Sequence, residues 1–143
     1  MTDSFDLARF VDAQAAHYGT ALGELKAGAK VSHWMWFIFP QIAGLGHSAM
    51  SKRYAIRSRA EAVAYLAHPE LGPRLRECAQ ALLAHHSRSA RDILGAPDDA
   101  KLRSSATLFA AVEGPGVFTQ LLDHYFGGAH DEASLALLRD EGP

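Results

Sequence analysis

The chain has 143 residues, of which 48% are hydrophobic and 21% charged, and its formal net charge is −2. This length fits a single domain over residues 1–143, and the composition argues against intrinsic disorder. The single cysteine excludes an internal disulfide framework, and no apolar stretch reaches the roughly 18 residues of a membrane span. The N-terminus carries Asp3 and Asp6 and lacks the apolar run of a secretory signal, so we expect a cytoplasmic protein.

Apolar residues recur at helical spacing from the N-terminus onward. Asp3 or Ser4 is placed to cap a first helix. Thr20 is placed to cap a second, short helix, which Gly28 ends in a left-handed conformation. Two separate helices are therefore predicted before residue 30.

Residues 31–39 are the one segment with a mixed signal. Trp, Phe and Ile favour strands, but Ser32 can instead cap a short helix that Pro40 ends. We favour the helix here, and minor irregular or extended structure is the alternative.

The rest of the chain has clear helix boundaries. Ser58 and Glu61 form a Ser-x-x-Glu capping box, and His68-Pro69 ends the helix that follows. Further boundaries are expected at a helix start near Glu70, at Ser89 with Asp92 and Gly95, at Asp98 or Asp99, at Gly114-Pro115-Gly116, at Gly127-Gly128 and at Asp131. These signals predict a compact all-α domain of about seven short to medium helices.

Charge is unevenly distributed along the chain. Residues 30–60 contain five Lys or Arg and no acid, whereas residues 104–143 contain one Arg and six acids. The basic window also contains aromatic residues, so it is the best functional lead. The acidic last third and the pI near 6.4 argue against a general nucleic-acid binder. An internal explanation is open too, in which the basic window packs against the acidic last third.

Several signatures of cofactor and metal chemistry are absent. The chain has no phosphate loop, no dinucleotide glycine fingerprint and no nucleophile elbow, so no cofactor is predicted. Its eight histidines are scattered without an H-x-x-x-H pair, so no metal site is predicted. Cys78 lies on the apolar stripe of its helix, which indicates a buried structural thiol rather than a nucleophile.

Within the basic window, several polar residues suit a small anionic ligand. Lys30 offers a point charge and Arg53 a bidentate clamp. Ser48 can cap a helix whose N-terminus favours an anion, and Gln41 offers both a donor and an acceptor. The aromatic binding candidates are Trp34, Trp36 and Tyr54.

These candidates have a simpler interpretation. An indole face can stack on a planar ring or a sugar, but residues 34–39 are apolar enough to belong to the core. The arginines and lysines of residues 52–59 can equally form a solvated surface. The turn Gly44-Leu-Gly46 lets the backbone approach a ligand closely.

Two residues could carry proton transfer. His33 can act as a hydrogen-bond donor or as a general acid or base near neutral pH. Glu24 is the one acid close in sequence to the cluster, so it is a candidate acid or base, or an orienter of His33. The alternative for Glu24 is an ordinary exposed helix residue.

Two further polar features lie on helices outside the window. Gln14 interrupts an apolar helix face, which indicates a buried polar contact. The hydroxyls of Ser104, Ser105 and Thr107 are expected to bond back to the carbonyls of their own helix.

The sequence resembles a bacterial family of unknown function, domain family 1810, over nearly its whole length. The most specific motif is Lys30-Val-Ser-His-Trp-Met-Trp-Phe-Ile-Phe-Pro-Gln41. Other shared motifs are Arg9-Phe10 with Ala13-Gln14, Gly44-Leu-Gly46 with Ser48, Tyr54-Ala-Ile56, Glu61-Ala62, His68-Pro69, Leu71-Gly72, Asp98 with Lys101-Leu102, and Ser104 to Phe109, with Ala106 in place of the usual Met. The resemblance implies a compact, mostly helical fold and supplies no activity. Members are sometimes labelled calpastatin, but nothing in this chain supports protease inhibition.

Two functional hypotheses follow. The first is a protein that binds a small anionic nucleotide- or sugar-phosphate-like ligand at an aromatic and basic pocket, with hydrolysis by His33 and Glu24 left open. The alternative is a non-catalytic interaction protein that docks an acidic partner through the same segment. The first hypothesis requires that Lys30, His33 and one of the two tryptophans line a common pocket.

Overall fold

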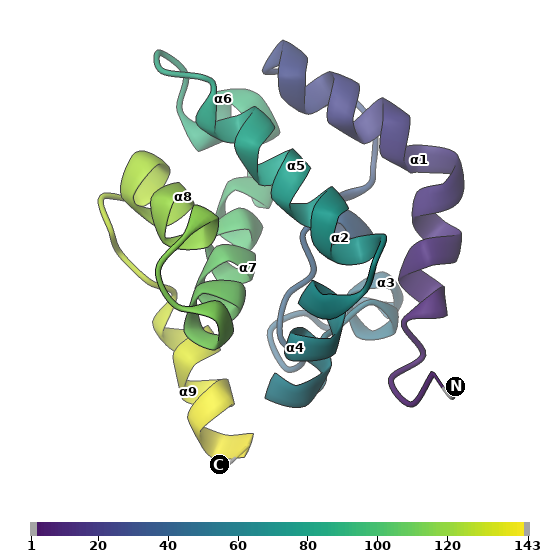
Figure 1. The fold of residues 1–143 in the computed structure, drawn as a ribbon. Coiled ribbons are helices and arrows are strands. Elements are labelled where there is room, and N and C mark those ends of the chain that lie inside the picture. The colour runs from purple at the N-terminus through teal and green to yellow at the C-terminus, as the bar shows by residue number, and fades with distance from the viewer. Residues whose placement is uncertain (1–2, 142–143) are drawn as a thin grey trace.

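The computed structural model describes residues 3–141, the last of them by its backbone alone, and their regular structure is helical (Figure 1). The helices of this part of the chain are α1 (Ala8–Ala27), α2 (Met35–Ile38), α3 (Ala49–Arg53), α4 (Arg59–Ala67), α5 (Leu71–Leu83), α6 (Ala90–Leu94), α7 (Asp98–Glu113), α8 (Val117–Phe126) and α9 (Glu132–Glu141). The all-α prediction is confirmed. The structure has more helices than the expected seven or so because α2, α3 and α6 are single turns of four or five residues.

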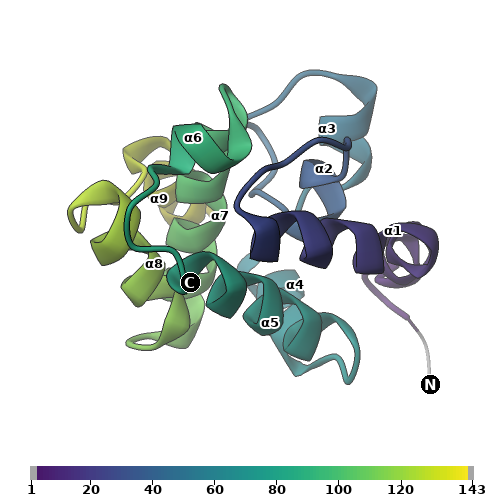
Figure 2. The same ribbon diagram turned by 90° about the horizontal axis from the view of Figure 1, so that it is seen from above.

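Helix α7 lies at the centre of the fold and packs against α4, α6, α8 and α9. Helix α5 packs against α1, α4 and α8, and in Figure 1 it crosses the face nearest the viewer. The view from above shows α2 and α3 on the opposite side of the molecule from α5 (Figure 2). The two short helices therefore form a separate face, which carries much of the basic window.

The N-terminal helix begins at Ala8, a few residues later than a cap at Asp3 or Ser4 predicts, and it does not break at Thr20. Asp3 accepts hydrogen bonds from the backbone N–H of Leu7 at 2.7 Å and of Ala8 at 2.8 Å. The predicted second helix is wrong, because α1 continues to Ala27 with Ala21 and Leu25 buried on its inner face. Apolar packing on one continuous stripe outweighs the local preference of a threonine for a cap.

Residues 31–39 adopt both of the structures that their sequence suggests. Met35–Ile38 form one helical turn, whereas the residues on either side are irregular. Just beyond the segment, Ile42 and Ile56 form an isolated parallel β-bridge, the one β feature of the described residues. Ser32 does not cap α2, since Trp34 occupies the cap position without a side-chain bond.

The starts of α4 and α6 are capped by the residues that the sequence predicts. Ser58 accepts a hydrogen bond from the N–H of Glu61 at 3.0 Å, but the Glu61 carboxylate binds elsewhere, so only half of that capping box forms. Ser89 and Asp92 form a complete box at α6. Asp98 is the first residue of α7, and it makes an ion pair instead of a cap.

The centre of α7 is buried on all sides. Residues 104–110 are buried without interruption, and five of them are small: two Ser, two Ala and one Thr. Ser104 Oγ shares its one proton between the Ala100 carbonyl, as expected for helix back-bonding, and Asp131 Oδ2. Ser105 Oγ has no hydrogen-bond partner among the described residues, so the predicted back-bonding does not extend to it. Thr107 Oγ1 accepts from the N–H of Asp131 at 2.9 Å, which joins the start of α9 to α7.

A buried guanidinium connects α1 to two other parts of the chain. Arg9 is 6% exposed and its five N–H groups all donate, to the carbonyls of Phe5, Asp6, Arg53 and Ala55 and to Glu61 Oε2. Glu61 is 1% exposed, and its second oxygen accepts from the N–H of Arg57 at 3.0 Å.

Gln14 is buried on the same helix. Its Nε2 donates to the Phe37 carbonyl at 2.7 Å and to the Tyr65 hydroxyl at 3.2 Å. The predicted buried polar contact is therefore confirmed, and it ties the short helix α2 to α1 and α4.

Cys78 is fully buried in α5, as its place on the apolar stripe predicts. Burial raises the pKa of the Cys78 thiol to about 12, although a hydrogen bond from Tyr18 opposes this. The thiol is therefore protonated at neutral pH and behaves as a small apolar side chain.

Gly72 marks a close approach between α4 and α5. A Cβ added at Gly72 would lie 2.1 Å from the carbonyl oxygen of Leu66, a backbone atom that cannot move aside cheaply. This contact gives a physical reason for a glycine in the Leu71-Gly72 motif. Gly23 offers the matched contrast, since it lies inside α1 with nothing within 4 Å of an added Cβ.

We expect Gly72→Ala to lower the free energy of unfolding by about 2 kcal/mol or more, because overpacking against a fixed backbone costs roughly 1–3 kcal/mol. Gly23→Ala should instead raise it by about 0.5–1 kcal/mol through helix propensity. Urea denaturation followed by far-UV circular dichroism measures both. Equal stability of Gly72→Ala and wild type would contradict the close approach.

Candidate functional site

The segment that leaves α1 is fixed by the carboxylate of Glu24. Glu24 Oε1 accepts hydrogen bonds from the N–H of Val31 at 2.8 Å, the N–H of Ser32 at 2.9 Å and Trp34 Nε1 at 2.9 Å. The second oxygen accepts from Ser32 Oγ at 2.7 Å. One carboxylate thus satisfies four donors of residues 31–34 and sets the path of the chain into α2.

This environment keeps Glu24 ionised. Partial burial raises the pKa of Glu24, but the hydrogen bonds from Ser32, Val31 and Trp34 together outweigh it and lower the pKa to about 2. A carboxylate in this state is a poor general acid or base at neutral pH, and no hydrogen bond of the described residues joins it to His33. The role in catalysis that the sequence suggested is therefore corrected to a structural one.

Trp34 and Lys30 are also occupied by structural contacts. Trp34 is 1% exposed, which leaves no free indole face for a ligand. Lys30 Nζ lies 3.0 Å from Asp98 Oδ2 and 5.0 Å from the centre of the Trp34 ring, and its side chain is 8% exposed. The expectation that Trp34 stacks on a ligand is therefore wrong, and Lys30 mainly joins this segment to the start of α7.

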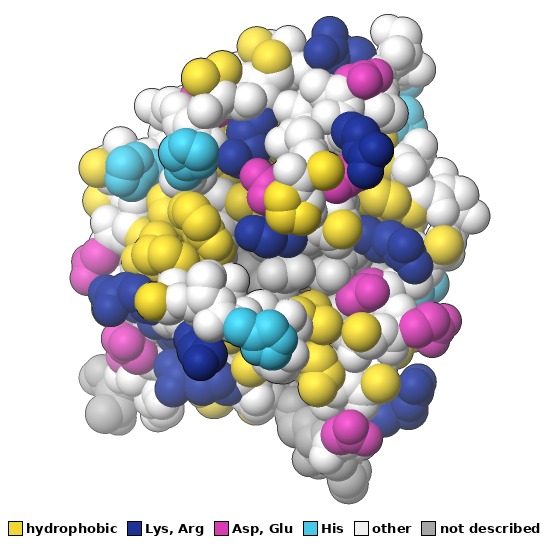
Figure 3. All heavy atoms as spheres, turned by 180° about the vertical axis from the view of Figure 1, so that it is seen from behind, with side chains coloured by type: hydrophobic (Ala, Val, Ile, Leu, Met, Phe, Trp, Pro, Cys, Tyr) yellow, Lys and Arg dark blue, Asp and Glu magenta, His cyan; other side chains and the backbone are white. Residues whose placement is uncertain are grey.

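A hollow that we call the basic pocket lies between α2, α3, the residues after α3 and α7. Its volume is about 120 Å³, and Met35 and Trp36 form part of its apolar wall. Its polar lining consists of Gln41, Ser51, Lys52, Tyr54, Arg57 and Lys101. Figure 3 shows the face that carries α2 and α3, where dark blue Lys and Arg side chains border hydrophobic ones.

The lining of the basic pocket contains three cations and no carboxylate. Lys101 lies 3.7 Å from Asp98 and 5.6 Å from the centre of the Trp36 ring. Arg57 lies 3.8 Å from Glu61, but 63% of its side chain is exposed, so this pair is weak. Lys52 has no ion pair within the described residues. The local balance is therefore positive.

Backbone pairing and a glycine shape this pocket. Ile56 donates its N–H to the Gln41 carbonyl and accepts from the N–H of Ala43, both at 2.8 Å, so the loop before α3 lies beside residues 54–57. A Cβ at Gly46 would lie 2.5 Å from the side chain of Ser51. The glycine thus permits the loop to close against α3, a contact within the chain, whereas the sequence had suggested contact with a ligand.

A second hollow, which we call the His33 hollow, adjoins the basic pocket. It has a volume of about 340 Å³, and it shares Met35 and Trp36 with the basic pocket. Lys30, His33 and Asp98 also line it. The grouping that the sequence analysis required, of Lys30 and His33 with one tryptophan, is thus present here, with Trp36 as the tryptophan. Trp36 stands between the two hollows and is partly exposed.

Three other candidates lie outside both hollows or contribute little. Ser48 caps α3 by accepting from the N–H of Ser51 at 3.1 Å and does not line either hollow. Arg53 is exposed, and its Nε donates to the Tyr54 hydroxyl at 3.3 Å. Tyr54 is 8% exposed and lines the basic pocket, whereas its ring packs in the core.

The sequence alone did not indicate Lys101 or Asp98 as site residues. For Lys52 and Arg57 it suggested a solvated surface as an alternative to binding. Lys101 and Asp98 lie on α7, far along the chain from the basic window, and no local pattern brings them to it. One signal could have found them, because the motif of Asp98 with Lys101-Leu102 is among the residues that carry the family resemblance.

Two cations of the basic window (residues 30–60) form ion pairs with acids that lie outside the acidic last third (residues 104–143). Lys30 pairs with Asp98, and Arg57 pairs with Glu61. Arg59 does reach that part of the chain, donating to the Ala111 carbonyl. Lys30 and Arg57 thus have their ion-pair partners outside the acidic last third.

Across residues 3–141, no three His, Cys, Asp or Glu side chains lie together in a way that would hold a metal ion. None of the helices in this range combines the length and the apolar character needed to cross a membrane.

These features define a small all-helical domain with a basic pocket beside a partly exposed tryptophan. The family model described as "Protein of unknown function (DUF1810)" matches residues 4–138, so the chain belongs to this family. A solved structure, the conserved hypothetical protein Rv1873 from Mycobacterium tuberculosis, matches with a TM-score of 0.94 and 51% sequence identity, over 96% of this chain and 99% of that chain. No curated protein matches. The resemblance is confirmed, and it assigns no activity.

The structural role of Glu24 predicts a specific sensitivity to acid. Its pKa is about 2 in the folded chain against an ordinary value of 4.5. The ionised carboxylate therefore stabilises the fold fully above about pH 4.5, and this contribution is lost as the pH falls toward 2. Glu24→Gln should lower the free energy of unfolding at neutral pH and flatten its loss on acidification, measured by urea denaturation with tryptophan fluorescence.

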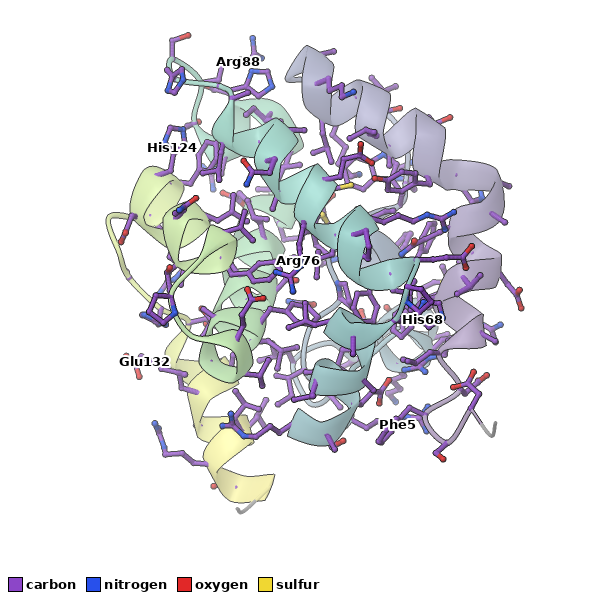
Figure 4. All side chains as sticks on the ribbon, in the orientation of Figure 1. Phe5, His68, Arg76, Arg88, His124 and Glu132 are labelled. Carbon is purple, nitrogen blue, oxygen red and sulfur yellow. The ribbon has the colours of Figure 1, made fainter. Side chains whose placement is uncertain are left out.

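Glu132→Gln is the control, since Glu132 is exposed on α9 and has no hydrogen bond to the described residues (Figure 4). It should leave the dependence of stability on pH close to that of wild type. If Glu24→Gln behaved like this control, the four hydrogen bonds would contribute nothing to the fold.

Proposed function

We propose that the protein binds a small anionic ligand of the nucleotide or sugar-phosphate class, with its anionic group in the basic pocket. The observation that carries the proposal is the lining of this pocket by Lys52, Arg57 and Lys101 without any carboxylate. Lysine and arginine together supply point charge and a planar donor pair, which suit a phosphate group. Gln41 adds a donor and an acceptor at the same wall.

The size of the pocket limits which part of a ligand enters it. Its volume of about 120 Å³ is well below the roughly 300–1,000 Å³ of usual ligand sites, so it holds only part of a nucleotide-sized ligand. The adjoining His33 hollow, of about 340 Å³, supplies the missing space.

Trp36 is the natural contact for the remainder of the ligand. It is shared by both hollows, so a ring or sugar that extends from the basic pocket would cross its face. Beyond it, the imidazole of His33 and the carboxylate of Asp98 are available for hydroxyl groups. The proposed ligand therefore has an anionic end, a planar or sugar middle and a polar end.

The proposal concerns binding rather than hydrolysis. The catalytic pair suggested by the sequence needs an acid beside His33, but Glu24 is committed to four hydrogen bonds and stays ionised. His33 is therefore proposed as a contact to the ligand. A bound acidic protein partner is the alternative, favoured by the exposure of Lys52 and Arg57, but the position of Lys101 beside Trp36 favours a small ligand.

Binding of inorganic pyrophosphate and adenosine monophosphate, measured by isothermal titration calorimetry, tests the anionic end. Lys52→Ala and Arg57→Ala should each lower the affinity for both ligands by roughly tenfold to a hundredfold, because a hydrogen bond to a charged group contributes about 1.5–3 kcal/mol. Lys26→Ala is the matched control, since Lys26 is exposed and lines neither hollow. If neither ligand binds at millimolar concentration, the proposal fails and the acidic-partner alternative gains.

Two more variants test the far end of the ligand. Trp36→Ala should lower the affinity for adenosine monophosphate by roughly fivefold to a hundredfold, since stacking of a base on an aromatic ring contributes about 1–3 kcal/mol. His33→Ala should also weaken it. Neither variant should change pyrophosphate binding, so equal losses for both ligands would contradict the division of the site at Trp36.

A further inference from the structure

A third hollow lies away from the basic pocket, and nothing in the proposed function uses it. It has a volume of about 660 Å³ and lies between the N-terminal segment with the first turns of α1 and the turn from α4 to α5. We call it the acidic groove. In Figure 4 the labelled side chains of Phe5 and His68 lie on this side of the molecule.

The surface of the acidic groove is apolar at its base. Leu7 is buried there, and Val11 and Ala64 are partly buried beside it. Ala67 and Pro69 extend the apolar surface to the end of α4 and are exposed. This apolar base is a surface on which apolar side chains of another molecule can pack.

The charges around this base are negative. Asp3, Asp12 and Glu70 line the groove, and no Lys or Arg of the described residues does so. Asp12 and Glu70 are exposed and take part in no ion pair among those residues. The nearest buried cation, Arg9, is saturated by its own five hydrogen bonds.

Neither helix N-terminus at the groove is free to hold an anion. Asp3 accepts from the N–H groups of Leu7 and Ala8 at the start of α1. His68 Nδ1 accepts from the N–H groups of Glu70 at 3.0 Å and Leu71 at 3.2 Å at the start of α5. The donors that attract anions elsewhere are therefore satisfied here, and the remaining free charges favour a cation.

We infer that the acidic groove docks a peptide segment of a partner protein in which apolar side chains are flanked by lysine or arginine. The apolar base receives the apolar anchors, and Asp12 and Glu70 face the basic residues beside them. The volume accommodates two or three side chains rather than a folded domain. The same charges disfavour an anionic lipid surface.

A second copy of this chain does not offer such a segment. Its large exposed hydrophobic residues in the described range are Val31 and Val63. The cation next to Val31 is Lys30, which is held by Asp98, and the cation one turn before Val63 on α4 is Arg59, which donates to the Ala111 carbonyl. The occupant is therefore expected to be a different protein.

Selection from a random peptide library displayed on phage, against the full chain, tests the inference without assuming a sequence. Enriched peptides should combine lysine or arginine with leucine, isoleucine, valine or phenylalanine. Their affinity, measured by fluorescence polarisation on synthetic copies, should fall with added salt. Asp12→Lys and Glu70→Lys should each weaken binding by roughly tenfold, because they place like charges opposite the peptide.

Ala67→Arg is the variant least at risk of unfolding, since residue 67 is exposed and a cation suits the end of a helix. It should both fill part of the groove and repel the peptide, with affinity reduced at least tenfold. Asp123→Lys is the matched control, an exposed acid on α8 that should leave binding unchanged. Circular dichroism of each variant verifies the fold.

The inference is overturned if the selection enriches no peptide or enriches peptides without basic residues. It is also overturned if the enriched peptides bind Asp12→Lys and Ala67→Arg as tightly as wild type. Lys52→Ala and Arg57→Ala should not affect the peptides, so failure here and failure of the anion site are distinguishable. Dimerisation abolished by Ala67→Arg would assign the groove to a second copy instead.

Discussion

A buried guanidinium joins three parts of the chain that are distant in sequence. The five N–H groups of Arg9 bind two carbonyls before α1, one carbonyl at the end of α3, one just after it, and the carboxylate of Glu61 on α4. Removing one partner of a buried pair of this kind costs about 3–5 kcal/mol, because it leaves an uncompensated charge inside the protein. That is a large share of the roughly 5–15 kcal/mol by which domains are usually stable.

Both proposed binding surfaces depend on this pair. The carbonyls of Arg53 and Ala55 are held by Arg9, and the neighbouring Tyr54 and Arg57 line the basic pocket. On its other side, Arg9 holds Phe5 and Asp6, and Phe5 borders the acidic groove. One side chain therefore fixes the backbone beneath a positive surface and a negative one, which explains why an arginine rather than a lysine is required.

Contacts between residues that are close in this sequence can be predicted from it, whereas contacts between distant residues cannot. The caps by Asp3, Ser58 and Ser89 bond to groups at most five residues away, so their spacing reveals them. Thr20 misleads because the buried stripe of α1 overrides a local preference. For the candidate site, the sequence cannot distinguish Trp36 from Trp34, since which indole is buried depends on the path that Glu24 imposes.

The chemistry of the sole cysteine has a practical consequence. Cys78 is fully buried and protonated, so thiol reagents in solution meet no native thiolate while the chain is folded. A cysteine introduced at an exposed position would then be the only reactive thiol. Fluorophores, spin labels and disulfide-tethered fragments can thus be attached beside the basic pocket or the acidic groove without replacing Cys78. This makes the small protein a convenient subject for covalent ligand discovery.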